Sequence, residues 1–407
     1  MGKNNTNLSW NSLPWKEFQI KLFQLQRRIF RAMQTENIQD TIKFQKMLLT
    51  SKAVYFMAIK KVTAEKNRNA NINLNYDAVL KLVLKLQDKL QYWEYNAIKK
   101  VCSNTEHKKR NCLELSTLED DIVFCIWHYA LEPIYNASFF TNAYGFRPYK
   151  TCLDLQKEIL FQFNYVKKKA VKKIVTVRIE NSFADLNYGL FLKNLIFPLD
   201  FKTSLMKALT NLLVINISLE NLNIQPNKNL FSLLINFILC GIENISINNT
   251  SCYGLRYLNS IVYILDSYED ENILLEKIIT FCKTKGMKIF FDTIYLVSSS
   301  KQFDFIHWHF VITNSLTITS YPSTDNWIIY KDTIKSLLQA STYPIKKRLE
   351  KIKMTTVNWY NNHRYSDMSK IKLQLYSLEN WYIRYLRKKT NISKIDFYFS
   401  LKYVLDS

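Results

Sequence analysis

The sequence predicts an α+β fold in which basic helical segments flank a β-rich middle. Apolar residues recur at helical spacing near both ends of the chain, whereas β-branched and aromatic residues gather in short runs between them. Hydrophobic residues make up 48% of the 407 residues, which is enough to form true cores. We therefore expect two or three packed units.

The first predicted element is an amphipathic basic helix that begins near Phe18. Its apolar positions recur at steps of four and three residues, and its basic residues occupy the remaining faces. A second helix is predicted from Ile42 to Val62, with five lysines on its polar side. Loops are then expected at 67–75 and 104–111, and helices at 76–101 and 118–131.

The middle of the chain contains the predicted strands. Lys173–Ile179 and Ile261–Leu265 are dominated by β-branched and aromatic side chains, and Lys288–Ser298 fits two strands joined by a turn. After Tyr343 the apolar spacing becomes helical again and continues through Leu386.

The net charge is concentrated at the two ends of the chain. The formal charge is +22, and residues 1–61 contain 11 basic and 3 acidic side chains, while residues 341–390 contain 12 and 3. Leu113–Tyr135, in contrast, contains five acidic residues and no Lys or Arg. This polarity favours a directed surface for RNA, DNA or an anionic membrane. The simpler alternative is a generally basic soluble protein whose helices merely face solvent.

Several classes of protein are disfavoured by the sequence. The seven cysteines form no C-x-x-C pair, so neither a disulfide framework nor a zinc site is indicated, and a reducing compartment fits best. Met1–Trp15 resembles neither a secretory signal nor a clear transit peptide, and Leu230–Ile242 is too short to span a bilayer. The abundance of residues with A/T-rich codons favours the AT-rich genome of an organelle or a reduced bacterium.

One long segment resembles a known family. Residues 130–155 read ALEPIYNASFFTNAYGFRPYKTCLDL, which is similar to the second and third conserved blocks of group II intron reverse transcriptases. Other segments follow in the order of that family. The palm blocks are matched by 173–188, 231–243, 255–265, 286–297 and 303–310, and the maturase domain X by 349–364 and 381–389. LPWKEFQIKLFQLQRRIFRAM resembles the basic N-terminal extension of the same enzymes, and the likeness is weakest between Ala184 and Gln225.

The resemblance implies a specific architecture. We expect reverse-transcriptase-like fingers and a palm with an antiparallel sheet, followed by a helical thumb and domain X. The implied division is 1–66 for the basic helical extension, 67–172 for the fingers and the start of the palm, 173–320 for a degenerate palm, and 321–407 for the thumb and domain X.

The carboxylates that polymerisation needs are missing from the matching positions. In this family three acids hold two divalent ions, which activate the attacking hydroxyl and stabilise the leaving phosphate. Here Arg178 stands where the first aspartate is expected, and Asn259 and Ser260 follow Tyr257 in place of the Asp-Asp pair. Because a cation and two neutral groups cannot hold magnesium, the resemblance implies a non-enzymatic protein.

Replacement acids are conceivable but not favoured. Four acidic residues lie nearby in the sequence: Glu180, Asp185, Asp266 and Asp292. Side chains alternate along a strand, so Glu180 shares a face with Arg178 and is expected to pair with it. The Gln-Gly-Gly turn of the family is also replaced, by the residues at 226–228.

Two histidines form a conceivable metal pair. His307 and His309 alternate around Trp308 and are predicted to share one face of a strand. Two histidines without a third ligand are more often structural. We therefore expect no metal site and no cofactor.

The basic residues are the predicted contacts to RNA phosphates, which supply most of the affinity for a nucleic acid. The predicted set is Arg27, Arg28, Arg31, Lys60, Lys61, Arg147, Lys346, Lys347, Arg348, Lys351, Lys353, Arg364, Arg384, Arg387, Lys388 and Lys389. Aromatic residues among them could stack on unpaired bases. Trp359, Trp381 and Leu386 fit better as the core of a small helical domain.

The implied function is that of a maturase-like protein. It would bind structured RNA, in particular a group II intron in a plastid, and assist splicing without reverse transcription and without a membrane; a homodimer is one option for its assembly. Within the family, the chain resembles the degenerate plastid forms that are associated with a ribosomal operon. Two alternatives stay open: a protein of ribosomal RNA or another organellar transcript with no splicing role, and an active reverse transcriptase with displaced carboxylates.

Overall fold

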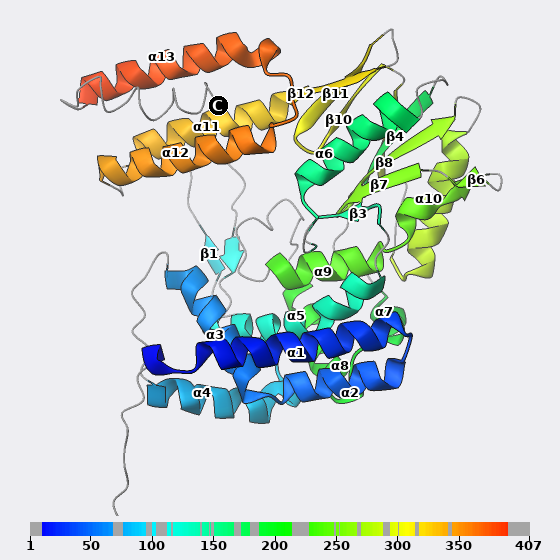
Figure 1. Ribbon diagram of the computed structural model, residues 1–407, viewed down its shortest axis with the longest axis vertical. Helices are drawn as coiled ribbons and strands as arrows, with labels where there is room; N and C mark the ends of the chain where they lie inside the picture. Colours follow the sequence, from blue (N-terminus) through cyan, green and yellow to red (C-terminus); the bar gives the residue numbers. More distant parts are fainter. Residues whose placement is uncertain are drawn as a thin grey trace, which may run out of the picture. The chain divides into compact units, whose positions relative to one another are not determined.

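The computed structural model combines long helices with small sheets, in agreement with the predicted α+β class (Figure 1). It describes residues 10–67, 76–94, 100–102, 112–114, 117–138, 141–145, 147, 150–166, 172–179, 187–213, 228–247, 250–251, 253–266, 270–287, 294–299, 301–313, 317–340 and 344–389. The chain forms two units, each assembled from three stretches. Unit 1 comprises 1–148, 179–242 and 276–294, and unit 2 comprises 149–178, 243–275 and 295–407.

Unit 1 consists mainly of helices. They are α1 (Trp15–Gln34), α2 (Ile38–Leu49), α3 (Lys52–Asn67), α4 (Tyr76–Lys89), α5 (Leu118–Ser138), α7 (Tyr188–Asn194), α8 (Leu199–Leu213) and α9 (Lys228–Ile238). The short helical turns are η1 (Trp10–Ser12), η2 (Leu90–Tyr92) and η6 (Ile242–Asn244). The first residue of η6 belongs to unit 1 and the other two belong to unit 2. The short strands of this unit are β1 (Lys100–Cys102), β2 (Cys112–Glu114) and β3 (Ala143–Tyr144). Helix α5 is buried along most of its length, and α1, α3 and α9 pack against it.

The predicted basic helix near the N-terminus is confirmed as α1. Leu22, Leu25 and Ile29 are buried on one face, as their spacing predicts. The single helix predicted over 42–62 is wrong, because the structure has two helices, α2 and α3, in this region. The main-chain N–H of Ser51 donates to the carbonyl of Leu48, which lies three residues earlier and not four as in an α-helix. Helix α2 ends at this turn.

Unit 2 contains two main sheets. Four strands lie in the order β7 (Tyr253–Tyr257), β8 (Ser260–Asp266), β4 (Lys172–Ile179) and β9 (Ile294–Ser299), and three lie in the order β10 (Gln302–Phe305), β11 (Trp308–Ile312) and β12 (Ile318–Pro322). A small hairpin joins β5 (Ser246–Ile247) to β6 (Thr250–Ser251). The predicted strands at 173–179 and 261–265 are confirmed as β4 and β8, and half of the predicted pair at 288–298 lies outside the described residues.

The helices of unit 2 begin with α6 (Cys152–Phe161), which continues as the π-helical turn η3 (Gln162–Val166). A capping box fixes the start of α6. The main-chain N–H of Asp154 donates to Oγ1 of Thr151, and the carboxylate of Asp154 accepts from the main-chain N–H of Thr151 at 2.8 Å. The Thr-Cys-x-Asp run, which is part of the family resemblance, therefore caps the N-terminus of α6. Helix α10 (Glu271–Thr284) begins in unit 2 and ends in unit 1.

The C-terminal part of unit 2 is a small helical subdomain. It contains α11 (Thr324–Gln339), α12 (Ile345–Asn362), the turn η8 (Ser369–Ile371) and α13 (Lys372–Lys389). Its core is rich in aromatic residues, and the rings of Tyr330 and Trp359 stack with their centroids 4.5 Å apart. Trp359 is buried and Trp381 packs against the same core, as the sequence predicts.

A buried ion pair holds the end of the β7–β8 hairpin. Nε of Arg256 donates to a carboxylate oxygen of Glu243 at 3.0 Å, and both side chains have an exposed fraction of 0%. Nη1 of the same arginine donates to the carbonyl of Leu258, in the turn, at 3.1 Å. Gly254 lets the strand pass close to Glu243, because a Cβ atom at this position would lie 2.5 Å from the carbonyl oxygen of Glu243. The turn is therefore tied to the residues that precede the sheet.

We predict that Glu243→Gln lowers the free energy of unfolding by about 3–5 kcal/mol, since it leaves the Arg256 charge buried and unpaired. Glu94→Gln is the matched control, because the Lys207–Glu94 pair has the same 3.0 Å separation but exposed fractions of 61% and 67%. The control should lower the free energy of unfolding by about 1 kcal/mol or less. Denaturant unfolding followed by circular dichroism measures both.

The double variant Glu243→Met, Arg256→Met should recover most of the loss, because it removes both charges together. Equal destabilisation by the two glutamine variants would contradict the structural importance of the buried pair.

Candidate functional site

The three positions predicted to have lost their acids lie together at one end of a sheet. In the antiparallel β4–β8 pair, Arg178 is the partner of Ser260, and in the β7–β8 pair Ser260 is the partner of Tyr257. Leu258 and Asn259 form the two-residue turn of the hairpin, with Leu258 in the left-handed region at a φ of 54°. Partners in register share a face of the sheet, so Arg178 and Ser260 project on the same side. The side chain of Arg178 is exposed there.

The acidic residues considered as substitutes are not gathered at this turn within the part of the chain that the structure describes. Asp266 is the partner of Lys172, at the opposite end of β8. It lies six residues from Ser260, or about 20 Å along a strand. Glu180, Asp185, Asp292, Pro226 and Asn227 lie outside the described residues, and Lys228 is the first residue of α9.

The predicted arrangement of the two histidines is wrong. His307 lies in the turn between β10 and β11, where its Nδ1 is 3.1 Å from Nδ2 of Asn326. His309 lies on β11, and its Nδ1 is 2.7 Å from a carboxylate oxygen of Asp304. His307 therefore lies in the hairpin turn together with Ile306, which has a φ of 57°, and not on a strand face shared with His309.

Asn326 also connects His307 to the helical subdomain. Its Oδ1 accepts from Nε1 of Trp359 at 2.8 Å and is 2.9 Å from Nε2 of His363. Burial lowers the pKa of His307 and lowers that of His363 to about 3, so both rings stay neutral near pH 7. These contacts give His307 a structural role.

Within the residues that the structure describes, no group of three or more His, Cys, Asp or Glu side chains is placed to hold a metal ion. The same part of the chain contains no helix with the length and apolar character that crossing a membrane requires.

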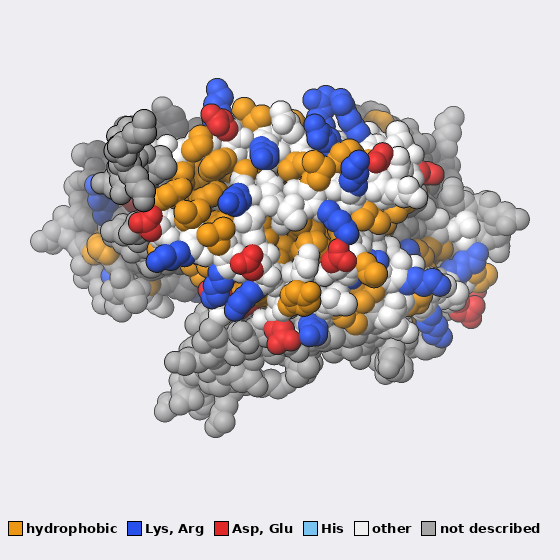
Figure 2. All heavy atoms as spheres, turned by 90° about the horizontal axis from the view of Figure 1, so that it is seen from below, with side chains coloured by type: hydrophobic (Ala, Val, Ile, Leu, Met, Phe, Trp, Pro, Cys, Tyr) orange, Lys and Arg blue, Asp and Glu red, His pale blue; other side chains and the backbone are white. Residues whose placement is uncertain are grey.

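The predicted N-terminal cations lie on the helices of unit 1. Arg27, Arg28 and Arg31 are exposed on α1. Nζ of Lys60 lies 4.3 Å from the ring centroid of Trp15, and Nζ of Lys61 lies 5.4 Å from that of Tyr129. Figure 2 shows one face of the molecule on which Lys and Arg side chains are spread among hydrophobic and uncharged groups, with acidic groups more sparse.

Arg147 of the YGFRP segment bonds to its own loop. Its Nη1 donates to the carbonyl of Ala143 at 2.9 Å, and the residue is half-buried. The same loop is held by Asn236 of α9, whose Nδ2 donates to the carbonyl of Gly145 at 2.8 Å. Gly145 has a φ of 85°, which explains the need for glycine in the motif. Arg147 therefore has a structural partner within its own loop.

The cations of the helical subdomain fall into two groups. Lys346, Lys347, Lys353, Arg364 and Arg384 are exposed, whereas Arg348 and Lys351 are half-buried. Nη1 of Arg348 donates to the carbonyl of Leu338 at 3.0 Å, near the end of α11. For Arg387, Lys388 and Lys389 the structure describes the backbone of α13 but not the side chains.

Two further cations lie over tyrosine rings and were not predicted. Nζ of Lys370 is 3.8 Å from the ring centroid of Tyr321, and Nζ of Lys157 is 4.8 Å from that of Tyr365. The members of each pair are far apart in the sequence, so no spacing pattern could have indicated them. They add basic and aromatic groups to the part of unit 2 that holds the helical subdomain.

Comparisons with known proteins agree with the predicted resemblance. Residues 10–90 match the model of the N-terminal domain of reverse transcriptase. The chain is 26% identical over 407 residues to Maturase-like protein 1 of Euglena gracilis, which covers 98% of this chain and 86% of that relative. It is also 26% identical over 405 residues to Maturase-like protein 1 of Euglena longa, with coverage of 97% and 86%. The resemblance inferred from the motifs is thereby confirmed: the chain is similar to maturase-like proteins along nearly its whole length and to the N-terminal domain of reverse transcriptase over residues 10–90.

Proposed function

We propose that this chain is an RNA-binding maturase of a plastid that assists the splicing of a group II intron and no longer performs reverse transcription. The observation that carries the proposal is the similarity to maturase-like proteins along 97–98% of the chain. The RNA supplies the chemistry of group II splicing in this scheme, and the protein stabilises the fold of the RNA. Such a role needs no metal or cofactor bound by the protein.

The proposal includes the four-part division of the chain. Residues 1–66 form the basic extension, 67–172 the fingers and the start of the palm, 173–320 the palm, and 321–407 the thumb and domain X. The match of residues 10–90 to the N-terminal domain of reverse transcriptase supports the first part. The β4, β7 and β8 strands support the palm, and α11, α12 and α13 support a helical domain X.

Loss of polymerisation is supported by the charges at the β7–β8 turn. Arg178 and Ser260 are partners across the sheet, and Asn259 lies in the adjacent turn. A guanidinium would repel a divalent ion at this position, and an amide and a hydroxyl replace neither missing charge. The buried Arg256–Glu243 pair lies next to the turn, but both of its charges are engaged with each other.

RNA contact is proposed for the exposed cations. Lys346, Lys347 and Lys353 lie on α12, and Arg364 follows that helix. On α1, Arg27, Arg28 and Arg31 form a second basic group. Each phosphate that such a side chain neutralises releases a counterion, so affinity should fall steeply with salt. We propose that Arg147 and Arg348 act mainly through their main-chain partners.

The first prediction concerns catalysis. Primer extension on an RNA template should yield no cDNA above background with either Mg²⁺ or Mn²⁺, because Arg178, Asn259 and Ser260 stand at the positions that carry the metal-binding carboxylates in the family. An active group II intron reverse transcriptase assayed in parallel verifies the template and primer. Robust extension by this chain would instead support a polymerase with displaced carboxylates.

The second prediction concerns the subdomain cations. Lys346→Glu together with Lys353→Glu should weaken binding to structured RNA at least about tenfold at moderate salt. The slope of log K against log salt should decrease in magnitude by about 1.5, because two phosphate contacts are lost.

The control is Lys193→Glu together with Lys283→Glu, two exposed lysines of unit 1 outside the predicted set. The two double variants have the same net charge, so a general charge effect would alter both equally. If both bind with the same reduced affinity and slope, the α12 lysines are not at the RNA interface.

The third prediction concerns the target. Crosslinking in plastids followed by sequencing of the bound RNA should enrich domains of a group II intron. Enrichment of mature ribosomal RNA or of an intronless transcript would favour the alternative in which the protein binds RNA without a role in splicing.

A further inference from the structure

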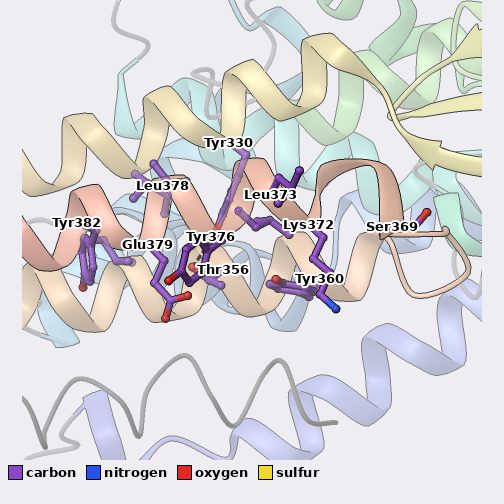
Figure 3. Close-up of a pocket in the computed structure, with 13 residues that line it drawn as sticks. Tyr330, Thr356, Tyr360, Ser369, Lys372, Leu373, Tyr376, Leu378, Glu379 and Tyr382 are labelled. Carbon is purple, nitrogen blue, oxygen red and sulfur yellow. Dashed lines mark hydrogen bonds between the residues drawn. The ribbon is translucent and has the colours of Figure 1, made fainter.

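A cavity of about 560 Å³ lies between α11, α12 and α13 (Figure 3). This volume falls within the range of about 300–1,000 Å³ that is usual for small-molecule sites. Its polar lining consists of four tyrosines, two aliphatic hydroxyl groups, one lysine and one carboxylate: Tyr330, Tyr360, Tyr376, Tyr382, Thr356, Ser369, Lys372 and Glu379. None of these residues belongs to the set of cations proposed to contact phosphates.

The tyrosines of the cavity fall into two groups. Tyr330 and Tyr382 are buried in the subdomain core, and the hydroxyl of Tyr330 is 3.2 Å from Oγ1 of Thr356. Tyr376, in contrast, is 64% exposed, although a large aromatic side chain gains little from contact with water. Burial raises the pKa of Tyr360, so its phenol stays protonated and can donate a hydrogen bond. The cavity therefore offers an exposed ring at its mouth and phenol groups inside.

Glu379 is the one acid of the lining. It is half-buried, and burial raises the pKa of its carboxyl. Within the described residues, it has no hydrogen-bond donor and no cationic partner. A partly desolvated carboxylate usually takes such a partner, so its oxygens are available to a ligand with N–H groups. Figure 3 shows Glu379 and Tyr376 projecting from the same side of α13.

The mouth of the cavity also has a cation. Lys372 is exposed and lines the cavity two helical turns before Glu379. Seven residues correspond to about 10 Å along a helix, a distance that can separate a base from the phosphate of its own nucleotide. Tyr376 lies between the two charged residues on the same helix.

We propose that this cavity binds an unpaired guanine of the RNA, with the Glu379 carboxylate accepting hydrogen bonds from N1–H and N2–H of the base. Tyr376 stacks on the base, and Lys372 contacts the phosphate. Single-stranded RNA is generally read in this manner, by stacking and by hydrogen bonds to the Watson–Crick edge. The inference rests on the proposed RNA-binding function and adds a specific base to it.

The chemistry of the four bases favours guanine. Only guanine presents two adjacent N–H donors that match the two oxygens of one carboxylate. Adenine and cytosine present an amino group beside a ring nitrogen that accepts, so one carboxylate oxygen would face a lone pair. Uracil has a single N–H between two carbonyl groups.

The test uses the full chain and free nucleotides in isothermal titration calorimetry. GMP should bind, whereas IMP, which lacks the N2 amino group, should bind about tenfold more weakly, and AMP and UMP should bind more weakly than IMP. Equal binding of the four nucleotides, or binding of arginine amide without binding of GMP, would overturn the assignment.

Three variants test the named residues. Glu379→Gln should weaken GMP binding about tenfold or more, because the charge and one of the two acceptors are lost. Tyr376→Ala should weaken it to a similar degree through the loss of stacking. Because this ring is 64% exposed, its removal leaves the buried core of the subdomain unchanged. Glu350→Gln, an exposed glutamate of α12 outside the cavity, is the matched control and should leave GMP binding unchanged. Unchanged GMP affinity in Glu379→Gln would reject the assignment.

The same variant separates this inference from the proposed function. Glu379→Gln should keep the salt slope of binding to structured RNA while losing the preference for guanine in unpaired loops. A chain that shows salt-dependent RNA binding but no guanine preference would refute the base pocket alone. A chain with no salt-dependent RNA binding would refute the proposed function itself.

Discussion

The buried pair of Arg256 and Glu243 is the interaction on which the geometry of the hairpin end depends. Two charges without exposure to water are stable only when they stay in close contact, so the strand and the residues before it cannot shift separately. The second bond of Arg256, to the carbonyl of Leu258, carries this constraint into the turn. The turn therefore does not need a bound ion to keep its shape. A chain can lose the acids of a polymerase site and still retain the sheet around it.

The basic residues differ in whether other groups of the protein already engage their charges. Arg147 and Arg348 donate to main-chain carbonyls, and Lys60 lies over the ring of Trp15. Lys346 and Lys353 are exposed on a helix whose other face is buried in an aromatic core. A large net charge thus arises from residues with different roles, and composition alone cannot separate them. The hydrogen-bond partners of each cation make that separation possible.

The sequence predicted those parts of the structure that depend on local spacing. The period of Leu22, Leu25 and Ile29 indicated α1 and its buried face, and the β-branched runs indicated β4 and β8. The break between α2 and α3 was missed, because it depends on how one turn closes at Ser51 rather than on the apolar pattern. The Arg256–Glu243 pair was missed for a different reason. An arginine in a strand normally indicates an exposed edge, and only tertiary packing brings its partner into contact.

The contrast between catalysis and binding explains how such a protein could persist under the proposed function. Metal-dependent polymerisation needs a few acids at fixed positions, so under the proposed function the residues Arg178, Asn259 and Ser260 abolish it together. Affinity for RNA is instead the sum of many phosphate contacts, and each lost contact lowers it only in part. A tyrosine-walled cavity and a group of exposed lysines can therefore remain useful after the polymerase chemistry has gone. Selection for RNA binding alone would preserve the fold, because the buried pair, the capping box of α6 and the aromatic core hold those surfaces in place.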